Sequence, residues 1–166
     1  MRYVLLDRIT LLQPPERACG VKCVTLAEDV FEHHFPGHPI FPGALIVESV
    51  AQVAGVLLEA AVRQLGHQDR HALLVRIDHA KFRHMVRPGD RMLMEVTSRR
   101  VHPDAAQVDG IAKVDERVVA EVALTFAFAH VTNPVLIARR KEQLQIWLDG
   151  TTEPTQLYTQ GKSSHP

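Results

Sequence analysis

Three histidines and one glutamate in the first third of the chain could carry acid–base chemistry. His33, His34 and His38 lie among prolines at positions 36, 39 and 42. Because proline fixes φ and removes a backbone donor, this segment is expected to be a shaped loop. Histidine titrates near neutral pH and can act as a base, whereas a carboxyl group in apolar surroundings is pushed toward its protonated form. Glu48, in the apolar stretch that follows, can therefore serve as the acid that complements a histidine base.

Pro42 and Gly43 add a third group, because they are expected to open a helix. Backbone N–H groups in a first helical turn have no acceptor within the helix and favour negative charge. The Gly43 amide is therefore a candidate donor to an oxyanion or enolate. With a base and an acid, it indicates chemistry on a carbonyl compound, in which an acidic α-proton is removed and a neighbouring hydroxyl leaves as water.

The helix that must position these groups is predicted over residues 44–65. It has no internal proline and about 22 residues, which give a rod of roughly 33 Å. Apolar residues point in nearly every direction around its axis, so we expect burial on most sides. Glu48, Gln52, Gly55 and Glu59 form one narrow polar stripe. We interpret Gln52 as a partner of Glu48 or as a buried amide satisfied by backbone, and Glu59 with Arg63 as an ion pair at the exposed end of the helix.

Strands are predicted on both sides of this helix. Patterns typical of strands, separated by turn residues, cover residues 3–12, 17–26, 72–82, 91–100, 106–114 and 117–129. The last four are interpreted as an antiparallel meander. Since the helices needed to cover a second face are missing, the prediction is an α+β fold in which one curved antiparallel sheet wraps around one long central helix.

A second, amphipathic helix is predicted over residues 134–149. Asn133 suits its N-cap, Pro134 its first position and Gly150 its end. Residues 151–166 are polar and aperiodic, and we expect them to be disordered. The predicted organisation is thus a main domain over residues 1–130, a C-terminal helix over 131–150 and a tail over 151–166.

Composition excludes several classes of function. The chain has 166 residues, with 19 lysines and arginines against 19 aspartates and glutamates, so nothing indicates nucleic-acid binding. Charged and amide residues inside the apolar helix argue against a membrane span. Cys19 and Cys23, four residues apart in a predicted strand, are too distant for a disulfide. With no signal peptide in evidence, a cytoplasmic location is expected.

The stretch HHFPGHPIFPGALIVESVAQ resembles the signature GHFPxxPxxPGxLxxExxAQ of the 3-hydroxyacyl-[acyl-carrier-protein] dehydratases. YVLLDRI, IDHAKFRHMVRPGD and RVVAEVALTFA are similar to further family segments, so the resemblance covers roughly residues 3–130. It implies the hotdog fold and dehydration of a (3R)-3-hydroxyacyl thioester to the trans-2-enoyl product. By position in the motif, it implies His34 and Glu48 as catalytic residues, with Gly43 and Gln52 in oxyanion and substrate binding.

The resemblance further implies a site without metal or organic cofactor, in a tunnel between two subunits. The expected partners are acyl carrier protein and a second copy of the chain, as a homodimer or as a hexamer built from three dimers. Phe41, Leu57 and Phe82 are candidate tunnel residues. The basic residues near the Pro-Gly turn at positions 88 and 89 are candidates for carrier docking, with a solvated rim as the alternative: Lys81, Arg83, Arg87 and Arg91.

Two departures from the family pattern are visible. His33 stands where the family has glycine, and the chain continues beyond residue 130 with a segment outside the usual pattern. Two other functions stay open: a hotdog thioesterase, which would use a helix carboxylate to activate water, and a non-catalytic acyl-binding subunit. A metal site at the histidines is not favoured, because neither a cysteine nor an acidic ligand completes the set nearby.

Overall fold

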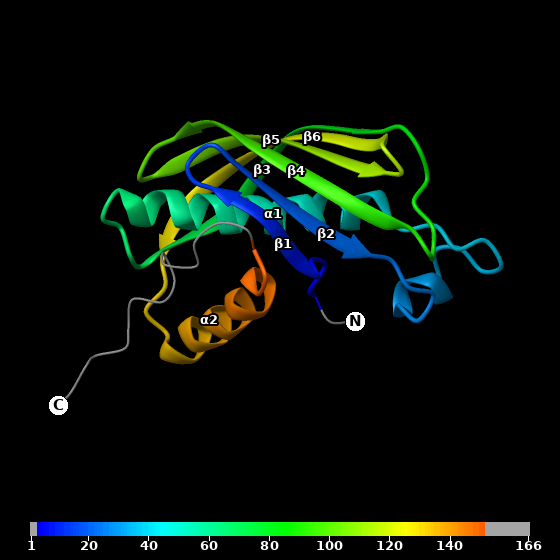
Figure 1. Ribbon diagram of the computed structural model, residues 1–166, viewed down its shortest axis with the longest axis horizontal. Helices are drawn as coiled ribbons and strands as arrows, with labels where there is room; N and C mark the ends of the chain where they lie inside the picture. The colour runs from blue at the N-terminus through cyan, green and yellow to red at the C-terminus, as the bar shows by residue number, and fades with distance from the viewer. Residues whose placement is uncertain (1–2, 152–166) are drawn as a thin grey trace.

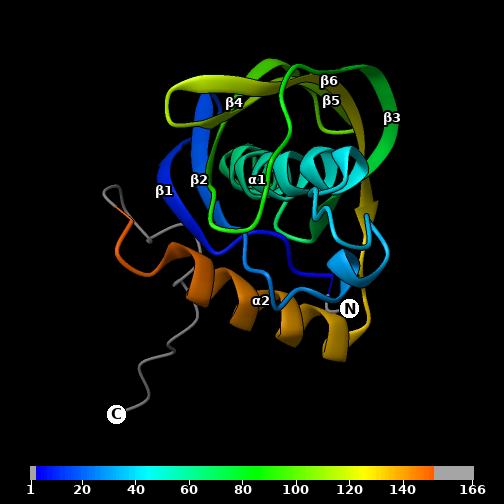
Figure 2. The ribbon, with the colours of Figure 1, turned by 90° about the vertical axis from the view of Figure 1, so that its right-hand side faces the viewer.

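One long helix, α1 (Gly43–Gln64), runs through the centre of the protein, and an antiparallel sheet wraps around it (Figure 1). The computed structural model describes residues 3–151. Seen nearly along α1, the sheet curves over the helix from β1 to β3, and the second helix, α2 (Pro134–Leu148), lies below (Figure 2). This is the hotdog arrangement, so the predicted fold class is confirmed.

The sheet has six strands in the order β1-β2-β4-β5-β6-β3, and all neighbours are antiparallel. The strands are β1 (Arg8–Gln13), β2 (Arg17–Cys23), β3 (Arg70–Phe82), β4 (Arg91–Val101), β5 (Ala105–Val114) and β6 (Arg117–His130). The prediction of a simple meander over the last four is wrong for β3, which pairs with β6. The loop after β3 leads past β6 and β5 to β4, which lies between β2 and β5, and β3 and β1 form the two edges of the sheet.

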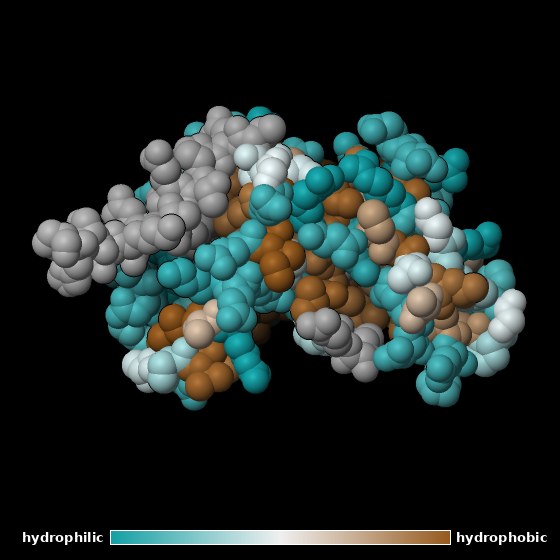
Figure 3. All heavy atoms as spheres, turned by 60° about the horizontal axis from the view of Figure 1, so that its bottom comes forward, coloured by the Kyte–Doolittle hydropathy of each residue, from teal (hydrophilic) through white to brown (hydrophobic). Residues whose placement is uncertain are grey.

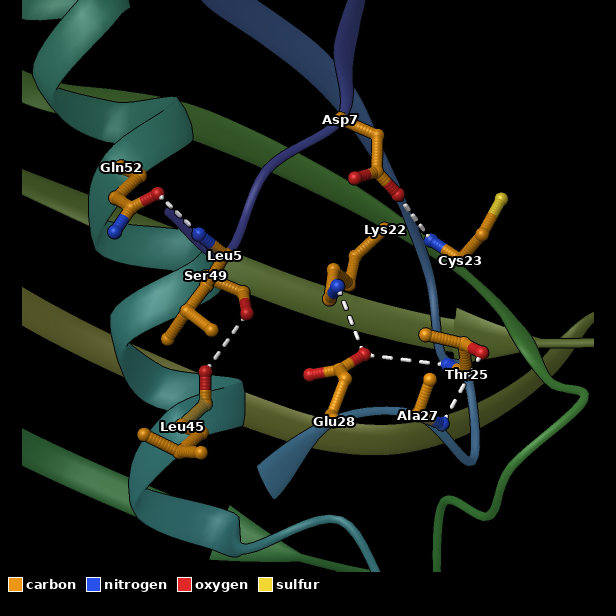
Figure 4. A network of polar contacts seen from close by, with 10 residues as sticks. All are labelled: Leu5, Asp7, Lys22, Cys23, Thr25, Ala27, Glu28, Leu45, Ser49 and Gln52. Atoms are coloured by element: carbon orange, nitrogen blue, oxygen red, sulfur yellow. Dashed lines mark hydrogen bonds and ion pairs between the residues drawn. The ribbon is translucent and has the colours of Figure 1, made fainter. Parts of the chain in front are cut away.

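The first two strands are shorter than predicted, because their ends bond elsewhere. Residues 3–7 were expected to be in the sheet, but the Leu5 N–H donates to the side chain of Gln52 on α1 at 3.0 Å (Figure 4). After Cys23, the Val24 N–H donates to the carbonyl of Asp90. The segment before β1 therefore contacts helix α1, and the segment after β2 contacts the loop before β4.

The core of the protein is built around α1. Val50, Val53, Val56, Leu57 and Leu58 are all fully buried against the inner face of the sheet. The helix is long and apolar enough to cross a bilayer by length and composition alone, but 83% of its most apolar window is buried inside the fold. Its hydrophobicity is therefore that of a core helix.

The C-terminal helix α2 begins as predicted. The Asn133 side chain accepts hydrogen bonds from the N–H groups of Val135 and Leu136, at 2.9 and 3.3 Å, which is the expected N-cap. In its second half, Leu144, Trp147 and Leu148 are buried. In its first half, apolar side chains remain exposed, and Figure 3 shows apolar surface among hydrophilic residues on the face that carries this helix.

The expected tail lies almost entirely outside the described residues. Of it, only Thr151 is described, and its hydroxyl donates to the carbonyl of Ile9 at 3.0 Å. Cys19 and Cys23 are both free thiols, as the strand spacing predicts. Burial raises the pKa of the Cys19 thiol, and the nearby charge of Glu95 raises it further.

Candidate active site

His34 lies in the loop between a short 3₁₀ helix (Asp29–Glu32) and α1. Its Nδ1 is 2.8 Å from the carbonyl oxygen of Ile40, so Nδ1 carries the proton and donates it to that carbonyl. In this tautomer Nε2 has a free lone pair and can act as a base. The ring of Phe35 stacks on the imidazole with centroids 4.2 Å apart. Backbone and ring contacts together hold the imidazole in one orientation.

His34 and Gly43 line the same cavity, which has a volume of about 900 Å³. Gly43 is the first residue of α1, so its N–H lacks an acceptor within the helix. A Cβ at this position would lie 2.9 Å from the ring of Phe82, so a larger residue would push this half-exposed ring aside. The cavity therefore brings together a base, a backbone donor at a helix N-terminus and an apolar wall.

Glu48 is one turn into α1 and half-buried. The Gln52 side-chain amide donates to its carboxylate at 3.0 Å, while the Gln52 carbonyl oxygen accepts from the Leu5 N–H. Both interpretations of Gln52 hold, because its amide contacts Glu48 and its remaining hydrogen bonds are to the backbone of Tyr3 and Leu5. Through these bonds Gln52 ties the carboxylate to the segment before β1.

Tyr3 is a neighbour of Glu48 that the sequence did not indicate. Partial desolvation, then the charge of Glu48 and a hydrogen bond to it, raise the pKa of the Tyr3 phenol above its ordinary value. The Tyr3 carbonyl also accepts from the Gln52 amide at 3.3 Å. No motif spacing links residue 3 to residue 48, so only the path of the N-terminal segment along α1 shows this contact.

Within one chain, His34 and Glu48 line different cavities. The Glu48 cavity, of about 300 Å³, lies between α1 and β3 and also includes Gln52, Gly55 and Glu59. The predicted polar stripe of α1 is therefore one wall of a single cavity. The His34 cavity lies at the start of α1, beside the loop that follows β3.

The other candidate residues fall into two groups. Phe41 and Phe82 line the His34 cavity, whereas Leu57 is fully buried in the core and lines neither cavity. Of the four basic residues proposed for carrier docking, Arg83 and Arg87 line the His34 cavity. The other two, Lys81 and Arg91, are exposed at the end of β3 and the start of β4.

His33 and His38 are exposed on the loop, and residues 3–151 contain no cluster of three side chains suited to hold a metal ion.

Glu59 is where the sequence interpretation was wrong. It was expected in an exposed ion pair with Arg63, but it is only 2% exposed. Arg140 of α2 donates from Nε to its carboxylate at 3.2 Å, and His71 Nδ1 of β3 lies 3.5 Å from it. Burial acts to raise the pKa of Glu59, but the hydrogen bond from His71 and the charge of Arg140 outweigh it and lower that pKa. Neither partner could be found from helical spacing, because both come from other elements.

A sheet wrapped around one helix, with a histidine loop before the helix and a glutamate on it, defines a hotdog protein of the dehydratase type. The family model described as FabA-like domain matches residues 1–123, and the chain belongs to this family. Helix α2 lies beyond the match.

Among curated relatives, the chain is 42% identical over 125 residues to the 3-hydroxyacyl-[acyl-carrier-protein] dehydratase FabZ of Bacillus velezensis, covering 75% of this chain and 86% of the relative. It is 39% identical over 127 residues to the FabZ of Caldanaerobacter subterraneus, covering 76% of this chain and 88% of the relative. These similarities confirm the dehydratase family expected from the motif.

Solved structures support the fold. The dehydratase heterocomplex ApeI:P from Xenorhabdus doucetiae superposes with a TM-score of 0.64 at 13% identity, over 82% of this chain and 90% of that one. A hypothetical thioesterase from Streptococcus pneumoniae, solved with coenzyme A, gives a TM-score of 0.57 at 9% identity, over 76% of this chain and 88% of that one. At these identities, the likeness concerns the fold alone.

Proposed function

We propose that the protein dehydrates (3R)-3-hydroxyacyl thioesters carried on acyl carrier protein, giving trans-2-enoyl thioesters. Family membership and the similarity to FabZ enzymes support this reaction. The observation that carries it is the shared cavity of His34 and Gly43, in which Nδ1 of the imidazole is engaged by Ile40 and Nε2 is left as the base.

In the proposed reaction, His34 Nε2 removes a proton from C2 of the substrate. The electron pair forms the C2–C3 double bond as the bond from C3 to the hydroxyl oxygen breaks. Glu48, in its protonated form, gives its proton to that oxygen, which leaves as water. The Gly43 N–H stabilises negative charge that develops on the thioester oxygen. No redox partner is needed, because the electron pair moves within the substrate, and the proton taken by His34 is matched by the proton given by Glu48.

His34 and Glu48 would meet across two subunits. They line separate cavities in one chain, whereas one substrate must contact both. The edge strand β3 supports such a homodimer, since Leu73, Val75 and Ile77 are each at least half exposed on it. An exposed apolar edge strand is a template for pairing with another strand. Pairing two β3 edges would bring the Glu48 cavity of one subunit toward the partner. Assembly of three dimers into a hexamer and the cytoplasmic location stay predictions.

The carrier would dock beside the His34 cavity. Arg83, Arg87 and Arg117 all line this cavity, and cationic side chains around an entrance attract an acidic partner. Arg83 already pairs with Glu121 at 2.5 Å, which leaves the other two as the stronger contributors.

The test is turnover of 3-hydroxyacyl thioesters on carrier protein or pantetheine, with the product analysed by mass spectrometry. Loss of one water to give the enoyl thioester is expected, in EDTA-treated protein as well. Release of the free acid from a saturated acyl thioester would instead indicate a thioesterase, and binding without any change would indicate an acyl-binding subunit.

A further inference from the structure

The Glu48 cavity ends in a buried charged cluster. Its wall on α1 runs from Glu48 to Glu59, and the eleven residue steps between them span about 16 Å along the helix axis. Between these ends the lining is mostly apolar, with Ala51 on α1, Leu74 on β3 and Phe126 on β6. A cavity of this shape, which begins at the proposed acid, suits an extended acyl chain.

Arg140 lines this cavity at its Glu59 end. It reaches from α2 to the Glu59 carboxylate at 3.2 Å, and its Nη2 would lie 3.7 Å from a Cβ placed on Gly55. His71 of β3 approaches the same carboxylate from the other side at 3.5 Å. The end wall thus consists of a guanidinium, a carboxylate and an imidazole from three different elements.

Further contacts hold Arg140 in place. Its guanidinium carbon lies 5.4 Å from the centroid of the Trp147 ring, and the Trp147 indole N–H donates to the carbonyl of Leu6 at 2.7 Å. Arg140 Nη1 also donates to the Gln143 side chain at 3.4 Å. The side chain is therefore anchored on both sides and is not free to swing away from Glu59.

We propose that Arg140, supported by Glu59 and His71, is the specificity-determining residue that sets the longest acyl chain the enzyme accepts. The inference rests on the proposed function, because it takes the Glu48 cavity as the acyl site. An acyl chain that filled the cavity would need to displace a hydrogen-bonded ion pair to extend further, and separating buried charges is strongly unfavourable. Shorter chains would not contact the wall. Since α2 lies outside the family match, this limit would be a property added by the C-terminal extension.

The experiment measures kcat/KM of the full-length protein for 3-hydroxyacyl pantetheine thioesters of increasing chain length. Arg140→Ala should move the upper length limit outward by at least about two carbons, and raise kcat/KM for the first rejected length roughly tenfold, since each buried methylene contributes a factor of about four. Values for shorter chains should stay within about twofold of wild type, because these chains end before the wall.

Two further variants complete the design. Arg139→Ala is the matched control, since Arg139 is the exposed neighbour on α2 and its length profile should equal that of wild type. If Arg140→Ala fails to fold because the buried Glu59 carboxylate loses its guanidinium partner, the double variant Arg140→Ala with Glu59→Gln is measured instead, because it opens the same space without a buried carboxylate.

A shift of the length limit in either Arg140 variant, absent in Arg139→Ala, supports the inference. An unchanged length profile in a folded Arg140 variant overturns it, even if the melting temperature falls, because Arg140 would then only fasten α2 to α1. If wild type dehydrates no thioester of any length, the proposed function fails, and the length limit is overturned with it.

Discussion

Gln52 joins two parts of the molecule through opposite ends of one side chain: its amide donates to Glu48 at 3.0 Å, and its carbonyl accepts from the Leu5 N–H at 3.0 Å. The first bond orients the proposed acid. The second gives the N–H of a buried residue its acceptor. One side chain therefore links the proposed acid to the segment before β1.

Gln52→Leu should lower both activity and stability. We expect kcat to fall roughly tenfold, because a misplaced acid loses its reactive geometry. The free energy of unfolding should drop by about 1–3 kcal/mol, because the Leu5 N–H is left buried without an acceptor. Steady-state kinetics and urea unfolding measure the two effects. Gln64→Leu, at the exposed end of the same helix, should show neither, and a similar loss there would point to a general effect on α1.

The two adjacent histidines should differ sharply in importance. His34→Ala is expected to reduce kcat by roughly 10²-fold or more, as for removal of a general base. His33→Gly should keep most of the activity, since His33 is exposed and lines no part of the His34 cavity. Circular dichroism verifies that both variants fold. The opposite ranking of the two variants would show that His33, and not His34, is the base.

A site shared between subunits predicts complementation. Inactive His34→Ala and Glu48→Ala proteins, unfolded together and refolded in equal amounts, should give about half mixed dimers, each with one intact and one doubly altered site. With random pairing and independent sites, roughly a quarter of wild-type activity should return. Each variant refolded alone should stay inactive. If native mass spectrometry shows mixed dimers but the mixture remains inactive, His34 and Glu48 act within one chain.

The buried Glu59 cluster predicts a specific acid sensitivity. The pKa of Glu59 is lowered in the folded protein from its ordinary value of 4.5, so the ionised carboxylate stabilises the fold fully above about pH 4.5. This contribution is lost as the pH falls through the lower, folded-state pKa. The difference in unfolding free energy between wild type and Glu59→Gln should therefore shrink as the pH falls below about 4.5.

Guanidinium unfolding at a series of pH values measures that difference. Glu142→Gln is the matched control, because Glu142 is exposed on α2 and should differ from wild type by little at any pH. A difference between wild type and Glu59→Gln that does not shrink below about pH 4.5 would show that folding leaves the pKa of Glu59 unshifted, and a difference that shrinks as the pH rises above about 4.5 would show that folding raises it.

The sequence by itself determined what depends on neighbours along the chain. Prolines at positions 36, 39 and 42 produce a loop, Gly43 opens the helix, and a 3.6-residue repeat places Glu48, Gln52, Gly55 and Glu59 on one wall. The predicted strand positions were correct within two residues from β3 to β6, because alternation and turn residues are local signals.

Only the tertiary structure decided which distant groups meet. Helical spacing predicted Arg63 as the partner of Glu59. In the fold, its partners are Arg140, 81 residues away, and His71 from β3. The neighbour of β3 in the sheet and the contact of Tyr3 with Glu48 are likewise long-range. Burial is the physical reason: a carboxylate enclosed by packing must find whichever cation the fold brings to it, and spacing along one helix does not record what packs against that helix.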